Sequence, residues 1–143
     1  MNVVNQLHPT GDQMAGFSAQ PSLGPICMVN LLKFRDTAEY PDGSDADLSG
    51  RDAYARYAEA VTRLVVDHGG ALVFSGDVSR LMLGDMDELW DQVAIARYPS
   101  RQAMLDMMMS PQYQAIHVHR EAGLAGQLNI ETINALLPVA DQH

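Results

Sequence analysis

The stretch that decides the fold is Pro25-Ile26-Cys27-Met28-Val29-Asn30-Leu31-Leu32-Lys33-Phe34-Arg35, the longest apolar run in the chain. Its length, between a proline and a polar loop over residues 36–49, is that of a β-strand. Successive side chains of a strand point to opposite faces, and both faces of this one begin with apolar residues. We therefore expect a central strand that is covered on both sides.

The composition restricts the class of protein and of partner. The chain has 143 residues and a hydrophobic content of 47%, which predicts one domain that can bury a core without disulfides. Its net charge of −9 disfavours nucleic acid as a partner, and no apolar stretch approaches the roughly 20 residues of a membrane span. The single cysteine, Cys27, lies inside the apolar run, as expected for a buried thiol in a reducing compartment. We expect a cytoplasmic protein without nucleic-acid or membrane partners.

Residues 1–24 are predicted to form an N-terminal extension, and residues 25–143 the main domain. Within the extension, Thr10 and Gln13 have the spacing of a capping box. A short helix is therefore expected over residues 10–18.

Residues 45–50, with the pattern Asp-x-Asp-x-Ser-Gly, imitate the first half of a calcium-binding loop. The twelfth position of such a loop needs a glutamate, and here it is Arg56, whose charge would oppose the metal. We therefore interpret Ser49 as the N-cap of a helix and expect no calcium site.

The helix that follows Ser49 is predicted over residues 50–68, because apolar residues recur there at steps of three and four. Gly69-Gly70 is a typical C-terminal stop. The spacing also predicts two ion pairs along this helix, Asp52 with Arg56 and Glu59 with Arg63.

The remaining elements complete a recognisable order. Strands are predicted over residues 71–83, with a bulge or bend at Gly76, over 90–98 and over 128–133. Helices are predicted after the cap Ser100 and, beyond a break at Ser110-Pro111, over 112–122. The order strand, helix, strand, strand, helix, strand predicts an α+β protein of the ferredoxin-like βαββαβ plan, with a four-stranded antiparallel sheet.

The helices of this plan cover one face of the sheet, whereas the central strand is apolar on both. Two sheets packed face to face would cover the second face. We therefore expect a homodimer.

Several short motifs together resemble the family numbered 1330 among domains of unknown function, over roughly residues 25–132. The motifs are Tyr54-x-x-Tyr57, His68-Gly69-Gly70, Tyr98-Pro99-Ser100, Ser110-Pro111-Gln112-Tyr113, and His119-Arg120 with Gly123. Met28 to Arg35 and Tyr40-Pro41-Asp42-Gly43 resemble a subgroup of it. The resemblance implies the dimeric α+β barrel superfamily, which includes cofactor-free monooxygenases, muconolactone isomerase, haem-degrading enzymes and haem peroxidases. Because fold alone does not choose among these reactions, the resemblance implies no particular one.

The candidate catalytic residues are His119 and Arg120, the pair that matches the family. They could supply a proton donor and a fixed cation for an anionic or enolate oxygen. The alternative is that Arg120 pairs with an acid and His119 is solvated. His117 and His119 would point in different directions on a helix, so we expect no metal site there, and no haem or other cofactor.

The candidate ligand-binding residues are Asn30, Arg97, Tyr54, Tyr57 and Tyr113. Asn30 is an amide on an apolar face and needs hydrogen-bond partners, from a ligand or from the protein itself. Arg97 could equally form a structural ion pair, and the tyrosines could be core residues. Some superfamily relatives resemble this chain in an asparagine on the first strand and a later tryptophan, here Trp90, for which a core or interface position is the alternative.

Two functions follow from these candidates. The first is a small cofactor-free enzyme that acts on a small carbonyl, enol or aromatic acid held between the sheet and the helices. The second is a dimeric module that binds a small ligand, or acts as an accessory protein, without turnover. A pocket in which the polar candidates converge would favour the first.

Overall fold

The structure, a computed structural model, describes residues 3–20 and 23–137. The remaining residues of the predicted extension and domain, 1–2, 21–22 and 138–143, lie outside this description. The strands are β1 (Ile26–Phe34), β2 (Ala71–Asp77), β3 (Gln92–Tyr98) and β4 (Leu124–Thr132). The helices are α1 (Gly11–Ser18), α2 (Gly50–Asp67), α3 (Arg101–Met108) and α4 (Pro111–Gly123).

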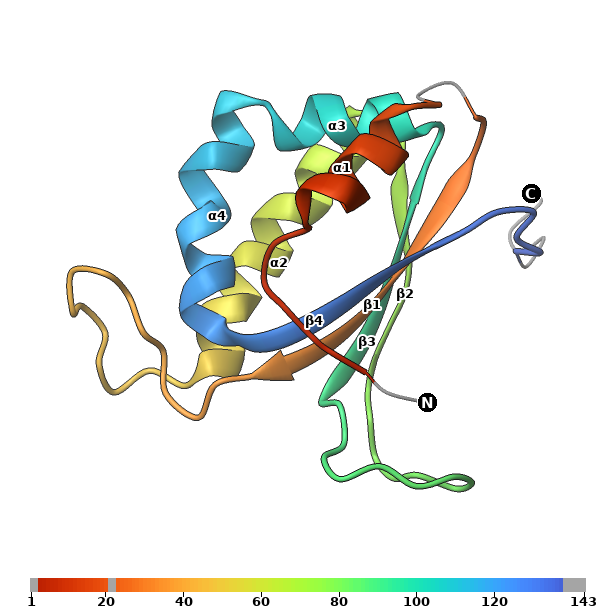
Figure 1. Cartoon of the computed structure of the whole chain (residues 1–143). Helices are drawn as coiled ribbons and strands as arrows, with labels where there is room; N and C mark the ends of the chain where they lie inside the picture. The colour runs from red at the N-terminus through yellow and green to blue at the C-terminus, as the bar shows by residue number, and fades with distance from the viewer. Residues whose placement is uncertain (1–2, 21–22, 138–143) are drawn as a thin grey trace, which may run out of the picture.

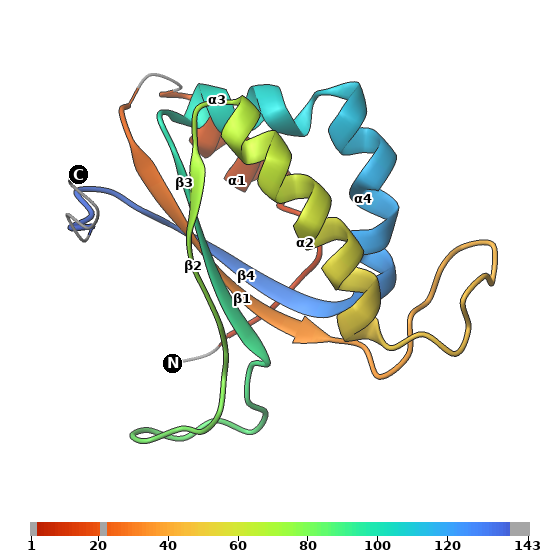
Figure 2. The ribbon, with the colours of Figure 1, turned by 180° about the vertical axis from the view of Figure 1, so that it is seen from behind.

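The strands form one antiparallel sheet in the order β2-β3-β1-β4. Helices α2, α3 and α4 lie on one face of this sheet (Figure 1), and the view from behind shows α2 on that same side, diverging from β2 (Figure 2). The predicted α+β class and ferredoxin-like plan are confirmed.

Each helix begins at a capping side chain that satisfies a backbone N–H of its first turn. The amide of Asp52 donates to Ser49 Oγ at 3.0 Å, that of Ala103 to Ser100 Oγ at 3.1 Å and that of Tyr113 to Ser110 Oγ at 3.2 Å. The capping box at the start of α1 is also formed. These local signals explain why the predicted helix starts agree with the structure within one residue.

Four predicted strand features are wrong. Strand β2 ends at Asp77 instead of Leu83, and β3 begins at Gln92, because residues 78–91 form a loop that projects from the end of both strands (Figures 1 and 2). Strand β4 begins at Leu124, directly after α4, because residues 124–127 pair with the end of β1. The irregularity in β2 lies between Leu72 and Phe74 and not at Gly76.

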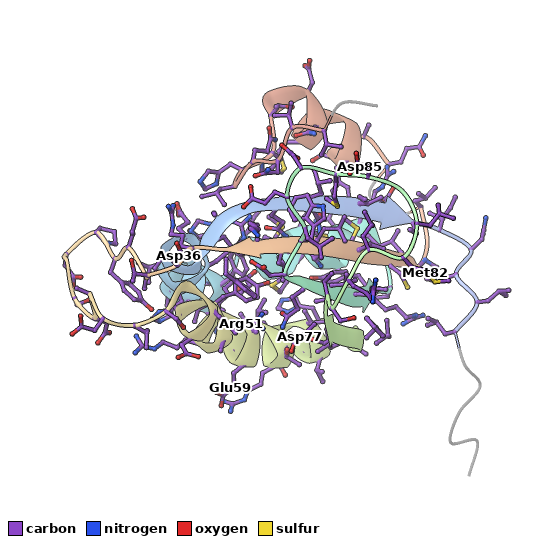
Figure 3. The ribbon with its side chains drawn as sticks, turned by 90° about the horizontal axis from the view of Figure 1, so that it is seen from below. Asp36, Arg51, Glu59, Asp77, Met82 and Asp85 are labelled. Atoms are coloured by element: carbon purple, nitrogen blue, oxygen red, sulfur yellow. The ribbon has the colours of Figure 1, made fainter. Side chains whose placement is uncertain are left out.

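One of the two predicted ion pairs on α2 is also wrong. Arg56 Nη1 lies 3.0 Å from Asp45 Oδ2 and donates to the Tyr40 hydroxyl at 3.2 Å, so its partners come from the preceding loop and not from Asp52. The other predicted pair, Glu59 with Arg63, forms at 3.3 Å. In Figure 3 Glu59 points away from α2 into solvent, where such a pair contributes little to stability.

The two faces of the sheet differ in what covers them. Cross-strand partners share a face, so the register places Met28, Asn30 and Leu32 of β1 with Ala96, Ala94 and Gln92 of β3. This inner face meets the helices, and its core includes the fully buried Leu32 and Leu124. The outer face carries Val29, Leu31, Val93, Ile95, Leu128, Ile130 and Phe74, with no helix over it within the described residues. Phe74 is 52% exposed and Ile130 46%.

The loop over residues 78–91 adds apolar surface beside this outer face. Its tip, with Met82 and Asp85 labelled, passes in front of the sheet when the molecule is seen from below (Figure 3). Met82 is 97% exposed and Leu83 is 87% exposed. Exposed apolar side chains gathered in this way typically mark an interaction surface.

Helices α2 and α4 approach so closely at their facing ends that only glycine fits. A Cβ at Gly123 would lie 2.5 Å from the Gly50 carbonyl oxygen and 2.7 Å from the Tyr54 amide nitrogen. We expect Gly123→Ala to lower the free energy of unfolding by about 1–3 kcal/mol or more, because backbone atoms must move apart. Urea unfolding measures this loss.

Gly16→Ala in α1 is the matched control, since a Cβ there has no neighbour within 4 Å. We expect it to leave the stability unchanged or to raise it by up to about 1 kcal/mol, as alanine favours helix. Equal losses in the two variants would contradict the close approach of α2 and α4.

Candidate ligand-binding site

A cavity of about 700 Å³ lies between the inner face of the sheet and the helices. It is lined from β1, β3 and β4 on one side, from α2, α3 and α4 on the other, and from the N-terminal segment that includes α1. Much of the lining is apolar and includes Met28, Ala96, Met104, Met107 and Phe17. Its size is within the range of cavities that hold small organic ligands.

Asn30 stands in the middle of the inner face with all its hydrogen-bonding capacity used. Its Nδ2 donates to the carbonyls of Met28 and Ala94 at 3.3 and 3.2 Å. Its Oδ1 accepts from Gln127 Nε2 at 2.7 Å and from Asn129 Nδ2 at 2.6 Å. An amide with two donors and two acceptors so engaged is held in one orientation. Asn30 therefore lines the cavity as a fixed support of other polar groups.

The polar chain continues from Asn30 to a guanidinium group. Gln127, which is only 9% exposed, accepts at its Oε1 from Arg120 Nη2 at 2.6 Å. The same Arg120 nitrogen donates to the carbonyl of Leu7 at 2.6 Å. The sequence of contacts Asn30, Gln127, Arg120 thus brings a cation from α4 to the wall of the cavity.

Arg120 is half-buried and its recorded partners are neutral. None of the ion pairs within residues 3–20 and 23–137 includes it, so the expected alternative of an acidic partner is not found there. A guanidinium forms its strongest hydrogen bonds with carboxylates and similar anions. The chemistry of this wall therefore favours an anionic group.

Three buried tyrosines lie beside this cation. The hydroxyls of Tyr57 and Tyr113 are 3.0 Å apart, and the rings of Tyr54 and Tyr57 have centroids 5.3 Å apart. Burial raises the pKa of Tyr54 and of Tyr57 above the usual range, and the Arg120 charge opposes part of that rise. The Tyr54 and Tyr57 phenols are therefore neutral groups that can donate or accept a hydrogen bond at the cavity wall.

The two histidines of α4 point to different surroundings, as predicted. His117 lines the cavity, where its Nδ1 lies 3.0 Å from Glu121 Oε2 and the centre of its ring lies 5.7 Å from that of Tyr113. Burial is the main cause that lowers the pKa of His117, with Glu121 acting against it. With Nδ1–H donating to Glu121, the neutral imidazole keeps Nε2 as a free acceptor.

His119 lies outside the cavity. Its Nδ1 is 2.7 Å from the Tyr40 hydroxyl, on the loop between β1 and α2. Burial, followed by the charge of Arg56, lowers the pKa of His119. Although His119 and Arg120 are neighbours in the sequence, the His119 side chain contacts the loop before α2, whereas the Arg120 side chain lines the cavity.

The basic side chains of the strands and of α4 do not gather at one place. By the register Arg97 shares the outer face with Val93 and Ile95, on the opposite side of the sheet from Arg120. Lys33 pairs with Glu88 and Asp91, and Arg35 with Glu39. Among the seven candidates, the cavity is lined by Asn30, Tyr54, Tyr57, Tyr113 and Arg120.

Gln127, Asn129 and His117 are among the polar residues of the cavity wall that sequence reasoning did not select as candidates. Gln127 and Asn129 alternate with Leu128 and Ile130 along β4 and share the face of Asn30. That signal is present in the sequence, but the predicted strand began one residue too late to include Gln127.

Arg101 and Glu131 form an ion pair in another part of the cavity wall. Arg101 Nε and Nη2 donate to the two oxygens of Glu131, both at 2.7 Å, and the Arg101 guanidinium lies 5.3 Å from the centre of the Phe17 ring. Because Arg101 is already paired with the Glu131 carboxylate, it is a weaker candidate than Arg120 for binding a ligand anion. Within the described parts of the chain, no three His, Cys, Asp or Glu side chains are placed to hold a metal ion, and no helix is long and apolar enough to cross a membrane.

Comparison with known proteins gives a family and a fold. The family DUF1330, described as a domain of unknown function, matches residues 44–131. RPA0582, a protein of unknown function from Rhodopseudomonas palustris, has a crystal structure with 34% sequence identity and a TM-score of 0.82, over 94% of this chain and all of that one. No curated protein matches the chain.

More distant structures share the fold alone. At3g17210 from Arabidopsis thaliana is 14% identical with a TM-score of 0.54, over 80% of this chain and 99% of that one. A candidate antibiotic biosynthesis monooxygenase from Caulobacter crescentus is 12% identical with a TM-score of 0.51, over 85% of this chain and 98% of that one.

Proposed function

Because the chain belongs to the DUF1330 family, which is defined without a reaction, we propose a function from its cavity: the protein binds a small organic acid. The observation that carries this proposal is the Arg120 guanidinium, half-buried at the cavity wall, whose hydrogen-bond partners among the described residues are all neutral. Burying a charge without a counter-charge is costly, and a ligand carboxylate or enolate would relieve that cost.

The remainder of the cavity supports an apolar or aromatic body for this acid. The three tyrosine rings and the methionine side chains provide apolar area, whereas the tyrosine hydroxyls and the amide of Asn129 provide a few polar contacts. A largely apolar cavity with few fixed polar groups is the usual form of a small-molecule site.

A cofactor-free acid–base step on the bound acid is the second candidate function. His117 supports it, because a neutral imidazole oriented by Glu121 lies on the same helix and the same cavity wall as Arg120. Its Nε2 could take a proton from carbon beside a carbonyl while Arg120 holds the resulting enolate. In this proposal His117 takes the acid–base role first assigned to His119.

We further propose that two copies of the chain pack outer face to outer face as a homodimer. The outer face of the sheet and the loop tip at Met82 and Leu83 are the apolar surfaces that such a contact would remove from water. In sedimentation equilibrium we expect about twice 15.6 kDa, and Ile95→Lys should give the single-chain mass because a lysine would be buried at the interface. A wild type that stays monomeric at micromolar concentration would refute the homodimer.

The acid site is tested by thermal shift with a panel of aromatic and aliphatic carboxylates. We expect some of these acids to raise the melting temperature of the wild type, and Arg120→Ala to abolish the rise because the cation is lost. The unliganded melting temperature of the variant should fall by a few degrees, since two hydrogen bonds are lost and the buried Gln127 Oε1 loses its donor.

Arg97→Ala is the matched control, because it removes an equal charge from the opposite face of the sheet. It should keep the response to acids. If both arginine variants lose the response, or if no acid stabilises the wild type, the assignment of the site to Arg120 is wrong.

A further inference from the structure

One wall of the cavity comes from a segment that the rest of the domain holds loosely. Residues 3–9 cross the edge of β4 and lead into α1, which lies beside α3 (Figure 1). None of the residues in α1 is buried, although Leu7 and Phe17 pack against the core. A segment with few buried contacts opens at much lower free energy than the whole domain. This segment, residues 5–18, is called the N-terminal wall below, and it lies outside the range 44–131 that matches the family.

The contacts of the N-terminal wall are concentrated near its first residues. The Gln6 amide donates to the Gln127 carbonyl at 3.2 Å, and His8 Nε2 lies 3.3 Å from Glu121 Oε1. The Leu7 carbonyl accepts from Arg120 at 2.6 Å. At the other end, Phe17 lies beneath the Arg101 guanidinium. The geometry is that of a flap with a hinge near Phe17 and a latch near Leu7.

The contact that holds the latch closed is the hydrogen bond from Arg120 to the Leu7 carbonyl, and Arg120 is also the residue that the proposed function assigns to the ligand. We propose that the Leu7 carbonyl occupies the position on Arg120 that a ligand carboxylate takes, so that an acid enters by displacing the N-terminal wall. This inference rests on the proposed acid site and adds the route of entry and the group that is exchanged. Hydrogen bonds between charged groups are about twice as strong as those to a neutral carbonyl, so the exchange favours the acid.

The same exchange predicts which ligands are accepted. A ligand without an anionic group cannot compete for Arg120 and leaves the latch closed. Phe17, which packs against the core at the hinge end, covers the apolar body of the ligand, while Leu7 stays displaced from Arg120. We therefore infer that the wall selects small acids with a compact apolar body, such as phenylacetate.

A reversible disulfide can hold the latch closed. The Asn5 side chain occupies the space that a Cβ at Gly126 would take, so the two positions are within disulfide range. In the Asn5→Cys/Gly126→Cys variant, the native Cys27 is 5% exposed and does not compete for pairing. The reduced form of the same protein, and the single variant Asn5→Cys, are the matched controls.

Binding of phenylacetate is measured by calorimetry in the oxidised and the reduced double variant. We expect the oxidised form to bind at least about tenfold more weakly, with affinity restored on reduction. Equal affinity in both forms would overturn the inference and leave the acid site standing, since the ligand carboxylate would then bind Arg120 without displacing the Leu7 carbonyl. If the wild type binds neither phenylacetate nor any other acid of the panel, the proposed function fails as well.

Hydrogen exchange tests the flap without any ligand. The Gln6 amide should exchange far faster than the amides of β1 under native conditions, and oxidation of the double variant should slow it. If the Gln6 amide of the wild type exchanges only by global unfolding, the N-terminal wall does not open and the inference is wrong.

Discussion

The interior of this domain depends on one chain of hydrogen bonds, from Asn30 through Gln127 to Arg120. Asn30 on the central strand has no unused donor or acceptor, and it fixes the carboxamide of Gln127, which in turn fixes the guanidinium. Each link is at least partly removed from water, so breaking one would leave a buried polar group unpaired. These hydrogen bonds hold the positively charged Arg120 guanidinium at the wall of an apolar cavity, in a protein whose net charge is negative. Both the ligand chemistry and the latch of the N-terminal wall follow from that placement.

Much of the fold could be predicted because its signals are local. Ser49, Ser100 and Ser110 each cap a helix through a hydrogen bond to a residue three positions ahead, which sequence spacing reveals directly. The strand ends were harder to predict because they depend on partners far away in the sequence. Leu81, Met82 and Leu83 have the composition of a strand but lie on an exposed loop. No local pattern reveals that the described residues leave their apolar surface uncovered.

The candidate site was predictable in its residue types and less so in its geometry. An amide on an apolar strand pointed to Asn30, and helix periodicity separated His117 from His119 without saying which of the two faces inward. The family resemblance favoured His119, whereas the fold turns His119 toward Tyr40 and His117 toward the cavity. The pairing of Arg120 with a backbone carbonyl in the extension joins residues 113 positions apart, which no spacing rule detects.

The central claim is that the charge of Arg120 is available to an anion inside the cavity. The most direct test compares, by calorimetry, the acid that stabilises the wild type most with its primary amide, which has nearly the same shape but no charge. The account predicts that the acid binds at least about tenfold more tightly, a difference of about 1.4 kcal/mol, and that Arg120→Met reduces the two affinities to the same value. Equal affinity of the acid and the amide for the wild type would contradict the claim.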